Sequence, residues 1–417
     1  MLNIYEDFKF RGLIKDFSNE EKIREMLKTP QVIYCGFDPS ASSMHMGNFV
    51  MVMTLMRLQR AGHKIIAVVG GGTGMIGDPS GRSSERNLLD ENTLRANTDA
   101  IHAQLGKYLD LDDPKKGEII NNYDWLGPIS LLTFLRDYGK MFTVNYMLAK
   151  DTVARRLEDG ISFTEFSYML LQSYDFLHLH QTKGVTMQIG GGDQWGNLTA
   201  GLELIRKVEG NEANCEAMTS MLLTDSEGKK FGKSVDGALF LDKKRLSPYK
   251  LYQYFLNVGD ESAIKYLKVF TFFAEEEINA IEKEHAINPG LRYAQKTLAS
   301  EIIRIVHGQK DLDRALAMSE ALFSGDVKSL AQDEIEELFA NMIVKVQSGT
   351  KLEDILIEVK AAKSKREARE FILGNSVTIN GDKVSDPNLV FDFEKAMYHQ
   401  YLIIRRGKKN YFVAALV

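Results

Sequence analysis

Apolar residues in the first 220 positions form short runs that alternate with stretches of helical spacing. The runs Val32–Tyr34, Lys64–Val69 and Thr186–Ile189 have the length of buried strands, and apolar positions between Gly47 and Ala61 recur as on one face of a helix. This alternation predicts an α/β fold with a parallel, doubly wound sheet. Because ligands of such sheets bind at the carboxyl ends of the strands, the loops that follow these strands are the first candidates for a site.

The rest of the chain changes pattern twice. Residues 247–325 have helical spacing and few glycines, and residues 326–350 have the character of a linker with some helix. Residues 351–417 combine two helical stretches with strand-like stretches around the turn Asn380-Gly381. We therefore predict a catalytic domain at 1–246, a helical domain, a linker and a small α+β domain.

Length and composition indicate a cytoplasmic protein of several domains. A chain of 417 residues is too long for one hydrophobic core. Its two cysteines, Cys35 and Cys215, argue against a disulfide framework, and the N-terminus lacks a segment typical of signal peptides. The longest apolar run, Phe49–Met56, is too short to cross a membrane, so no membrane partner is expected.

The net charge is −5, but residues 351–417 carry 12 basic and 9 acidic residues. An acidic body argues against a purely electrostatic nucleic-acid binder. The basic tail indicates nucleic-acid contact at chosen places.

Two glycine-rich stretches only approximate known phosphate-binding motifs. Gly72–Gly77 has the spacing of a dinucleotide fingerprint, but Asp78–Gly81 turns the chain where a helix should begin. Gly228–Ser234 is one residue short of a P-loop, and no helix start follows it. Both alternatives, a nicotinamide enzyme and a P-loop ATPase, are therefore disfavoured.

A third loop, Tyr34–Asn48, joins the first predicted strand to the following helix. A helix N-terminus offers unpaired N–H groups to a phosphate, and Ser40 and His45 add side-chain donors. For His45 alone, a simple helix cap is the favoured interpretation.

The segment His45–Asn48, followed about 185 residues later by Lys230–Ser234, resembles the paired HIGH and KMSKS motifs of class I aminoacyl-tRNA synthetases. The resemblance covers nearly the whole chain and is closest to tyrosyl-tRNA synthetases of the bacterial type. It implies a Rossmann-like catalytic core and an S4-like RNA-binding tail. Further segments share it: 34–39, 76–80, 163–168, 171–176, 188–191 and 193–197.

A row of polar residues supports tyrosine as the amino acid that the site would bind. After the capping box Ser162–Glu165, the residues Tyr168, Gln172 and Asp175 share one face of a predicted helix that is otherwise apolar. A solvated helix face is the alternative interpretation. With Tyr34 at the neighbouring strand end, the row instead indicates a ligand pocket.

The resemblance implies a role for each of these residues. Tyr34 and Asp175 hold the phenol oxygen of tyrosine, and Gln194 lies beside its carboxylate. The ammonium group is held by Asp78, Tyr168 and Gln172. Tyrosyl-tRNA synthetases are themselves the established example of a site that rejects an analogue lacking the hydroxyl by about 10⁴–10⁵, without an editing domain.

The resemblance also implies that ATP arrives as its Mg²⁺ complex and that the protein holds no metal. The histidines His178 and His180 lack further ligands at metal spacing, which argues against zinc. Expected ATP-binding residues are Cys35, Gly36, Asp38, Ser40, His45, Gly47, Asn48, Gly191, Asp193, Lys230 and Lys233. Expected catalytic residues, which neutralise the leaving pyrophosphate, are Ser40, His45, Asn48, Arg82, Arg86, Lys230, Lys233 and Ser234.

Two departures from the family motifs stand out: Asn48 replaces the second histidine of HIGH, and Phe231-Gly232 replaces the Met-Ser pair of KMSKS. In the tail, two basic clusters are expected to bind tRNA(Tyr) phosphates, although a solvated face is the alternative for each. They comprise Lys365, Arg366, Arg369, Arg405, Arg406, Lys408 and Lys409. A homodimer is implied by the resemblance alone. The rival hypotheses are a tryptophan-specific sister enzyme and a non-catalytic RNA-binding descendant of a synthetase.

Overall fold

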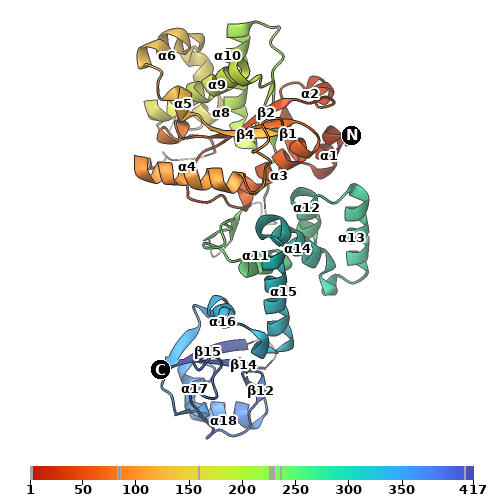
Figure 1. The fold of residues 1–417 in the computed structure, drawn as a ribbon, viewed down its shortest axis with the longest axis vertical. Helices are drawn as coiled ribbons and strands as arrows, with labels where there is room; N and C mark the ends of the chain where they lie inside the picture. The colour runs from red at the N-terminus through yellow and green to blue at the C-terminus, as the bar shows by residue number, and fades with distance from the viewer. Residues whose placement is uncertain are drawn as a thin grey trace. The chain divides into compact units, whose positions relative to one another are not determined.

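The computed structural model describes residues 3–81, 84, 87–157, 160–224, 231–234, 237–407 and 410–417; at 233 and 234 only the backbone is described. The chain forms two compact units (Figure 1). The first comprises Met1–Leu246 with Tyr254–Ile302, and the second comprises Ser247–Gln253 with Ile303–Val417. No helix of the described residues is long and apolar enough to span a membrane.

The first unit is built on a six-stranded sheet in the order β1-β6-β5-β2-β3-β4. Its strands are β1 (Ile14–Phe17), β2 (Val32–Phe37), β3 (Lys64–Val69), β4 (Gly117–Asn121), β5 (Met187–Gly191) and β6 (Glu216–Ser220). All neighbours pair in parallel except β1, which runs antiparallel along the edge of β6. The chain winds outward from β2 to β4 and then restarts at β5 on the other side of β2. This confirms the doubly wound sheet, and the reversal lies between β2 and β5.

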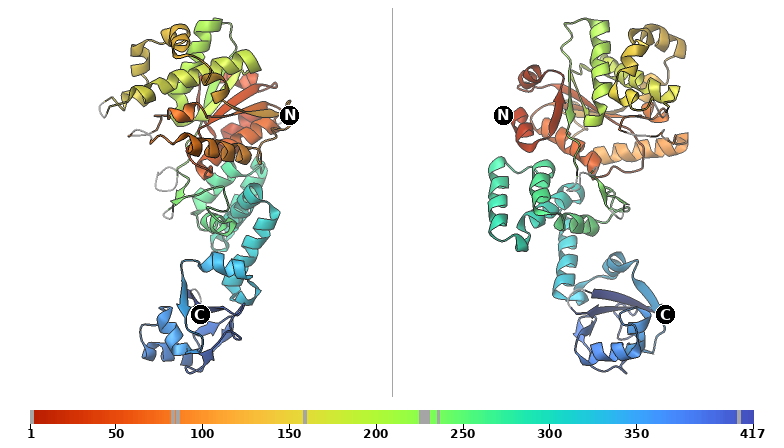
Figure 2. Two further views of the ribbon diagram at one scale, coloured as in Figure 1. Left: turned by 60° about the vertical axis from the view of Figure 1, so that its left-hand side comes forward. Right: turned by 180° about the vertical axis from the view of Figure 1, so that it is seen from behind.

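Helices cover both faces of this sheet (Figures 1 and 2). On one face, Ile66 and Val68 of β3 share a core with Leu177 and Leu204. Those two residues come from α9 (Phe163–Lys183) and α10 (Trp195–Glu209), while α3 (Met46–Arg60) and α4 (Glu91–Leu105) cover the opposite face. Burial on both faces explains why the strands read as continuous apolar runs.

Smaller elements complete the first unit. They are α1 (Ile4–Arg11), α2 (Glu20–Met26), α5 (Tyr123–Leu126), α6 (Leu131–Asp137), α7 (Val144–Leu148), α8 (Asp151–Ala154), β7 (Lys233–Ser234) and β8 (Gly237–Ala238). The helices that follow in the chain, of which α11 and α14 are divided between the two units, are α11 (Pro248–Leu256), α12 (Asp260–Phe270), α13 (Glu275–Ile287) and α14 (Tyr293–His307).

The structure corrects the predicted helical domain at 247–325. Arg57 of α3 donates hydrogen bonds to the carbonyl oxygens of Val269 and Thr271, and Arg11 of α1 donates to that of Lys268. These contacts bind the end of α12 to the sheet unit, so the first unit extends to Ile302.

The second unit centres on a five-stranded sheet in the order β12-β11-β14-β15-β9. Its strands are β9 (Ile343–Val346), β11 (Val377–Ile379), β12 (Asp382–Lys383), β14 (Tyr401–Arg406) and β15 (Asn410–Leu416), and β10 (Thr350–Lys351) pairs with β13 (Val390–Phe391). The helices are α15 (Gln309–Ser324), α16 (Gln332–Phe339), α17 (Leu352–Glu358) and α18 (Lys365–Leu373). Asn380 and Gly381 both have positive φ, as expected for the predicted hairpin turn.

The linker predicted at 326–350 is also corrected. Its strand β9 pairs in parallel with β15, so this segment supplies an edge of the sheet. On one face of the sheet, Met318 and Ala321 of α15 share a core with Tyr401 and Val413. The segment was predicted to be a linker because β9 becomes a strand only when it pairs with β15, which is formed by the last residues of the chain.

Candidate active site

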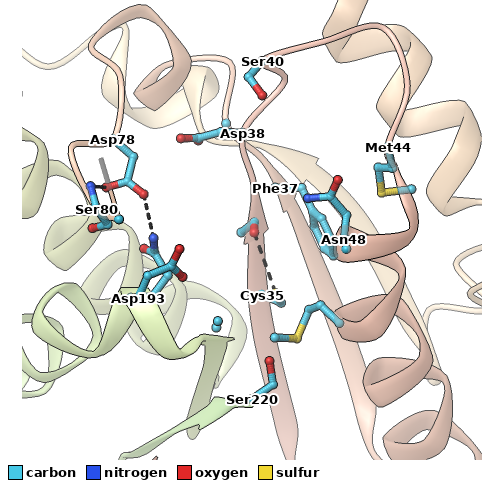
Figure 3. A pocket seen from close by; sticks show the side chains of 18 of the residues that line it. Cys35, Phe37, Asp38, Ser40, Met44, Asn48, Asp78, Ser80, Asp193 and Ser220 are labelled. Carbon is cyan, nitrogen blue, oxygen red and sulfur yellow. Dashed lines mark hydrogen bonds between the residues drawn. The ribbon is translucent and has the colours of Figure 1, made fainter. Parts of the chain in front are cut away.

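A cavity of about 500 Å³ opens at the carboxyl ends of β2 and β5, where the strand order reverses. This is the position at which doubly wound sheets bind ligands. Figure 3 shows Asp78, Ser80 and Asp193 on one side of the cavity and Asn48 on the other, with Cys35 on β2 between them.

At one end of the cavity lie Tyr34 and Asp175, which the sequence predicted to meet. Both line the cavity and are almost completely buried. The Tyr34 hydroxyl accepts a hydrogen bond of 2.7 Å from the Gln188 amide. Burial, followed by the charge of Asp175, raises the pKa of Tyr34 well above its ordinary value, so the phenol stays protonated.

The Asp175 carboxylate has an unusual environment. Asn122 donates to one oxygen at 2.9 Å and the Trp125 indole donates to the other at 2.7 Å. Burial nevertheless raises the pKa of Asp175 to about 7, although these two hydrogen bonds oppose the shift. Such a carboxylate is suited to accept a further hydrogen bond from a ligand hydroxyl, which would stabilise its charge.

Sequence reasoning missed Asn122, Trp125 and Gln188. Asn122 and Trp125 follow β4, a strand that was not predicted. For Gln188 the sequence did hold a signal, because it is a polar residue within an otherwise apolar predicted strand. The structure shows that this residue is buried.

The middle of the cavity carries acceptors. Asp78 accepts from the Gln194 amide at 2.6 Å, and Asp38 accepts from the Tyr168 hydroxyl at 2.9 Å. The buried Oε1 atom of Gln172 has no hydrogen-bond partner. No lysine or arginine occurs among the described residues that line the cavity. The excess of acceptors and negative charge favours a ligand with a cationic donor.

The predicted row on α9 therefore converges on the cavity, because Tyr168, Gln172 and Asp175 all line it. Asp38, which was assigned to the nucleotide, is hydrogen-bonded to Tyr168 of this row and to the Thr73 hydroxyl at 3.1 Å.

Helix α3 begins at the other side of the cavity. Nδ1 of His45 accepts from the backbone N–H groups of Gly47 and Asn48 at 3.0 and 3.3 Å, and the Asn48 side chain accepts from the His45 N–H. The helix-cap interpretation of His45 is thus confirmed. With Nδ1 acting as an acceptor, the ring proton of the neutral imidazole resides on Nε2, which makes that atom a hydrogen-bond donor.

The two motif segments meet at this helix start. A Cβ on Gly232 would lie 2.9 Å from the Gly47 nitrogen, and a Cβ on Gly47 would lie 3.1 Å from the Phe231 oxygen. Lys230, Arg82 and Arg86 lie outside the described residues. For Lys233 and Ser234 only the backbone, as β7, is described.

The remaining nucleotide candidates among the described residues also line the cavity. Cys35, Gly36, Ser40, Gly191 and Asp193 all line it. Burial raises the pKa of the Cys35 thiol, so it remains neutral. A Cβ on Gly191 would lie 2.7 Å from the Asp193 carboxylate, so the Asp193 side chain would have to shift.

The two histidines weighed for zinc have other partners. The His178 ring stacks on Trp125, and the His180 ring lies 3.2 Å from the Cys215 sulfur. Among the described residues, no group of three or more His, Cys, Asp or Glu side chains is placed to hold a metal ion.

In the second unit, the predicted basic clusters engage the protein itself. Lys365 pairs with Asp354 at 2.6 Å and Arg369 with Glu353 at 2.5 Å. Two further basic residues donate to backbone carbonyls, Arg405 to that of Ser324 and Arg406 to that of Ala361. Arg366 is exposed. Lys408 and Lys409 lie outside the described residues.

Two family models match the chain. The model described as class I tRNA synthetases (W and Y) covers residues 26–324. The model described as the tyrosine–tRNA ligase SYY-like C-terminal domain covers residues 334–414. The chain therefore belongs to the class I tRNA synthetases.

Relatives narrow this class. The tyrosine–tRNA ligases of Bacillus caldotenax and Geobacillus stearothermophilus are each 47% identical to the chain over 416 residues, which is 99% of both proteins. A truncated mitochondrial tyrosyl-tRNA synthetase from Aspergillus nidulans superposes with a TM-score of 0.69 at 31% identity, covering 78% of this chain and 95% of that one. Within its class, the chain belongs to the tyrosine–tRNA ligase family. This confirms the predicted resemblance and argues against the tryptophan-specific alternative.

Proposed function

We propose that the protein ligates L-tyrosine to tRNA(Tyr) in two steps, first forming tyrosyl-adenylate and pyrophosphate from ATP and then releasing AMP. One observation supports the proposal: the cavity has the Tyr34 hydroxyl and the Asp175 carboxylate at one end and a group of acceptors at Asp78 and Gln172. Tyrosine offers a phenol at one end and an ammonium group at the other, so it complements both.

In the first step, the tyrosine carboxylate attacks the α-phosphorus of ATP and the bond to pyrophosphate breaks. The carboxylate is already ionised at neutral pH, so the protein supplies position and charge instead of a general base. We assign the phenol oxygen to Tyr34 and Asp175. The ammonium group falls to Asp78, Tyr168 and Gln172, with Gln194 beside the carboxylate.

The nucleotide is assigned to the start of α3. The partial positive charge of a helix N-terminus favours phosphate. Nε2 of His45 adds a donor, because Nδ1 already accepts from the Gly47 and Asn48 N–H groups. We propose that Ser40 and Asn48 assist it, and that Cys35, Gly191 and Asp193 bind the ribose. Arg82, Arg86, Lys230 and Lys233 are assigned to the pyrophosphate on the strength of the motifs alone. Mg²⁺ is expected to arrive as part of the ATP substrate, bound largely through its phosphates.

Exchange of labelled pyrophosphate into ATP tests the proposal, with tyrosine, tryptophan and phenylalanine supplied in turn. Exchange should occur with tyrosine and be lower with phenylalanine by about 10⁴–10⁵. Preferential exchange with tryptophan would point to the sister specificity. Absence of exchange with all three would favour the non-catalytic RNA-binding hypothesis.

We also propose that the protein is a homodimer working in the cytoplasm, where tRNA is charged. Four large apolar side chains in the segment between β4 and β5 are each more than 60% exposed, and contact with a second copy of the chain would bury such side chains. They are Leu131, Leu132, Val144 and Phe163. Sedimentation should give twice the chain mass for the wild type and a smaller species for Leu132→Asp. A monomeric wild type would refute the dimer.

For tRNA, we propose that the exposed Arg366 and the neighbouring basic residues of the second unit contact phosphates. Arg366→Glu should then weaken tRNA binding and flatten its salt dependence without changing pyrophosphate exchange.

A further inference from the structure

The ring of Phe231 is buried although the residue lies in the predicted lysine loop. It is 4% exposed, and its ring centroid lies 4.8 Å from that of Tyr266, 5.6 Å from that of Phe270 and 6.3 Å from that of Phe255. We call these three neighbouring rings the aromatic socket. Phe255 comes from the last turn of α11, whereas the other two rings come from α12.

The backbone beside this ring touches the helix proposed to bind phosphate. The Phe231 oxygen and the Gly232 backbone approach Gly47 so closely that a Cβ on either glycine would collide or be crowded. Gly232 also has a φ of 103°, which L side chains rarely adopt. Residues 231 and 232 therefore connect the socket to the first turn of α3.

The aromatic socket is itself fixed to α3. Phe49 of α3 stacks on Phe270 with ring centroids 6.3 Å apart and an interplanar angle of 12°. Near the other end of α3, the buried Arg57 donates to the carbonyl oxygens of Val269 and Thr271 at the end of α12. A guanidinium group is favoured there because helix C-termini carry partial negative charge. The socket and the phosphate-binding end of α3 thus form one packed body.

We propose that Phe231 is a positioning residue, which holds the backbone of residues 231 and 232 against the first turn of α3 for pyrophosphate departure by seating its ring in the aromatic socket. This inference rests on the proposed function. Lys230 and Lys233, the lysines assigned to the pyrophosphate, are one and two residues from Phe231 in the sequence. Positioned charge matters most in the transition state, and a small misplacement can lower the rate by about 10²-fold.

The test uses the full-length protein and the variants Phe231→Ala and Phe231→Met. Methionine fills the socket with a flexible apolar chain and is the residue that the KMSKS motif carries at this position. We expect Phe231→Ala to lower kcat of tyrosine-dependent pyrophosphate exchange by about 10²-fold, with tyrosine Kd changed less than about twofold. Phe231→Met should restore most of the rate.

Leu105→Ala is the matched control, because Leu105 is fully buried on α4 and lies outside the socket. It should lower Tm without the loss of kcat. Phe270→Leu, which widens the socket from α12, should reproduce a smaller kcat loss even if Phe231→Ala does not fold.

Three results would overturn the inference: a wild-type kcat in Phe231→Ala, an equal kcat loss in Leu105→Ala, or a parallel loss of tyrosine affinity. Absence of exchange in the wild type would instead remove the proposed function itself.

Discussion

The proposed tyrosine end and the proposed nucleotide end of the cavity are built by different means. At the tyrosine end, the contacts come from buried side chains on regular elements: Tyr34 on β2, Asp175 on α9 and Gln188 on β5. At the nucleotide end, the described contacts come mostly from backbone at the start of α3 and at residues 231–232. Recognition of a hydroxyl requires a rigid, desolvated partner, whereas phosphate chemistry requires charge aimed at a transition state.

This difference predicts that substitutions at the two ends fail in different ways. Damage at the tyrosine end should appear as lost discrimination between amino acids. Damage at the nucleotide end should appear as a lower rate with discrimination intact.

The largest effect is expected for Asp175→Ala. It removes the carboxylate proposed to pair with the phenol, so the penalty for leaving that carboxylate unpaired with phenylalanine should disappear. The ratio of kcat/KM for tyrosine over phenylalanine should fall by about 10²-fold or more. Parallel pyrophosphate exchange with the two amino acids measures it. An unchanged ratio would show that Asp175 does not read the hydroxyl.

A somewhat smaller effect is expected for His45→Asn, which separates the cap from the donor. Asparagine is a good helix cap, so Tm should stay within a few degrees of the wild type. Without the Nε2 donor, kcat should fall by about 10²-fold while the preference for tyrosine over phenylalanine is retained. His45→Ala is the companion variant, because it loses both cap and donor and should lower Tm as well. Full activity in His45→Asn would reduce His45 to a cap.

The smallest effect on kcat/KM is expected when the protein is unchanged and only the pH is lowered. The pKa of Asp175 is raised to about 7, so the free enzyme loses the carboxylate as pH falls below 7. The value of kcat/KM for tyrosine should therefore fall as pH drops, by about tenfold per unit well below the pKa. Because the pKa of Asp175 is higher in the folded protein than in the unfolded chain, ionisation of this carboxyl group destabilises the fold. The free energy of unfolding should therefore decrease as pH rises from about 4 to 7.

Asn122→Ala sharpens the pH experiment. The Asn122 hydrogen bond lowers the pKa of Asp175, so its removal should move the acid limb to higher pH. An acid limb that does not respond to Asn122→Ala would have to arise from another group.

The doubly wound sheet was predictable because its strands are buried on both faces and its helices keep one spacing. The residues Tyr168, Gln172 and Asp175 were predictable as a row because helix periodicity alone places them on one face. The segment at 326–350 was not, since β9 is a strand only through its pairing with β15 at the end of the chain.

The sequence by itself determined the family, the three central strands β2, β3 and β5 of the sheet and the polar row on α9, because these depend on local order and spacing. Only the tertiary structure decided that Asn122, Trp125 and Gln188 are hydrogen-bonded to Asp175 and Tyr34 and that Phe231 is seated among rings of α11 and α12. These contacts join residues far apart in the chain, and a hydrogen bond or ring contact exists only once folding has brought its two partners together.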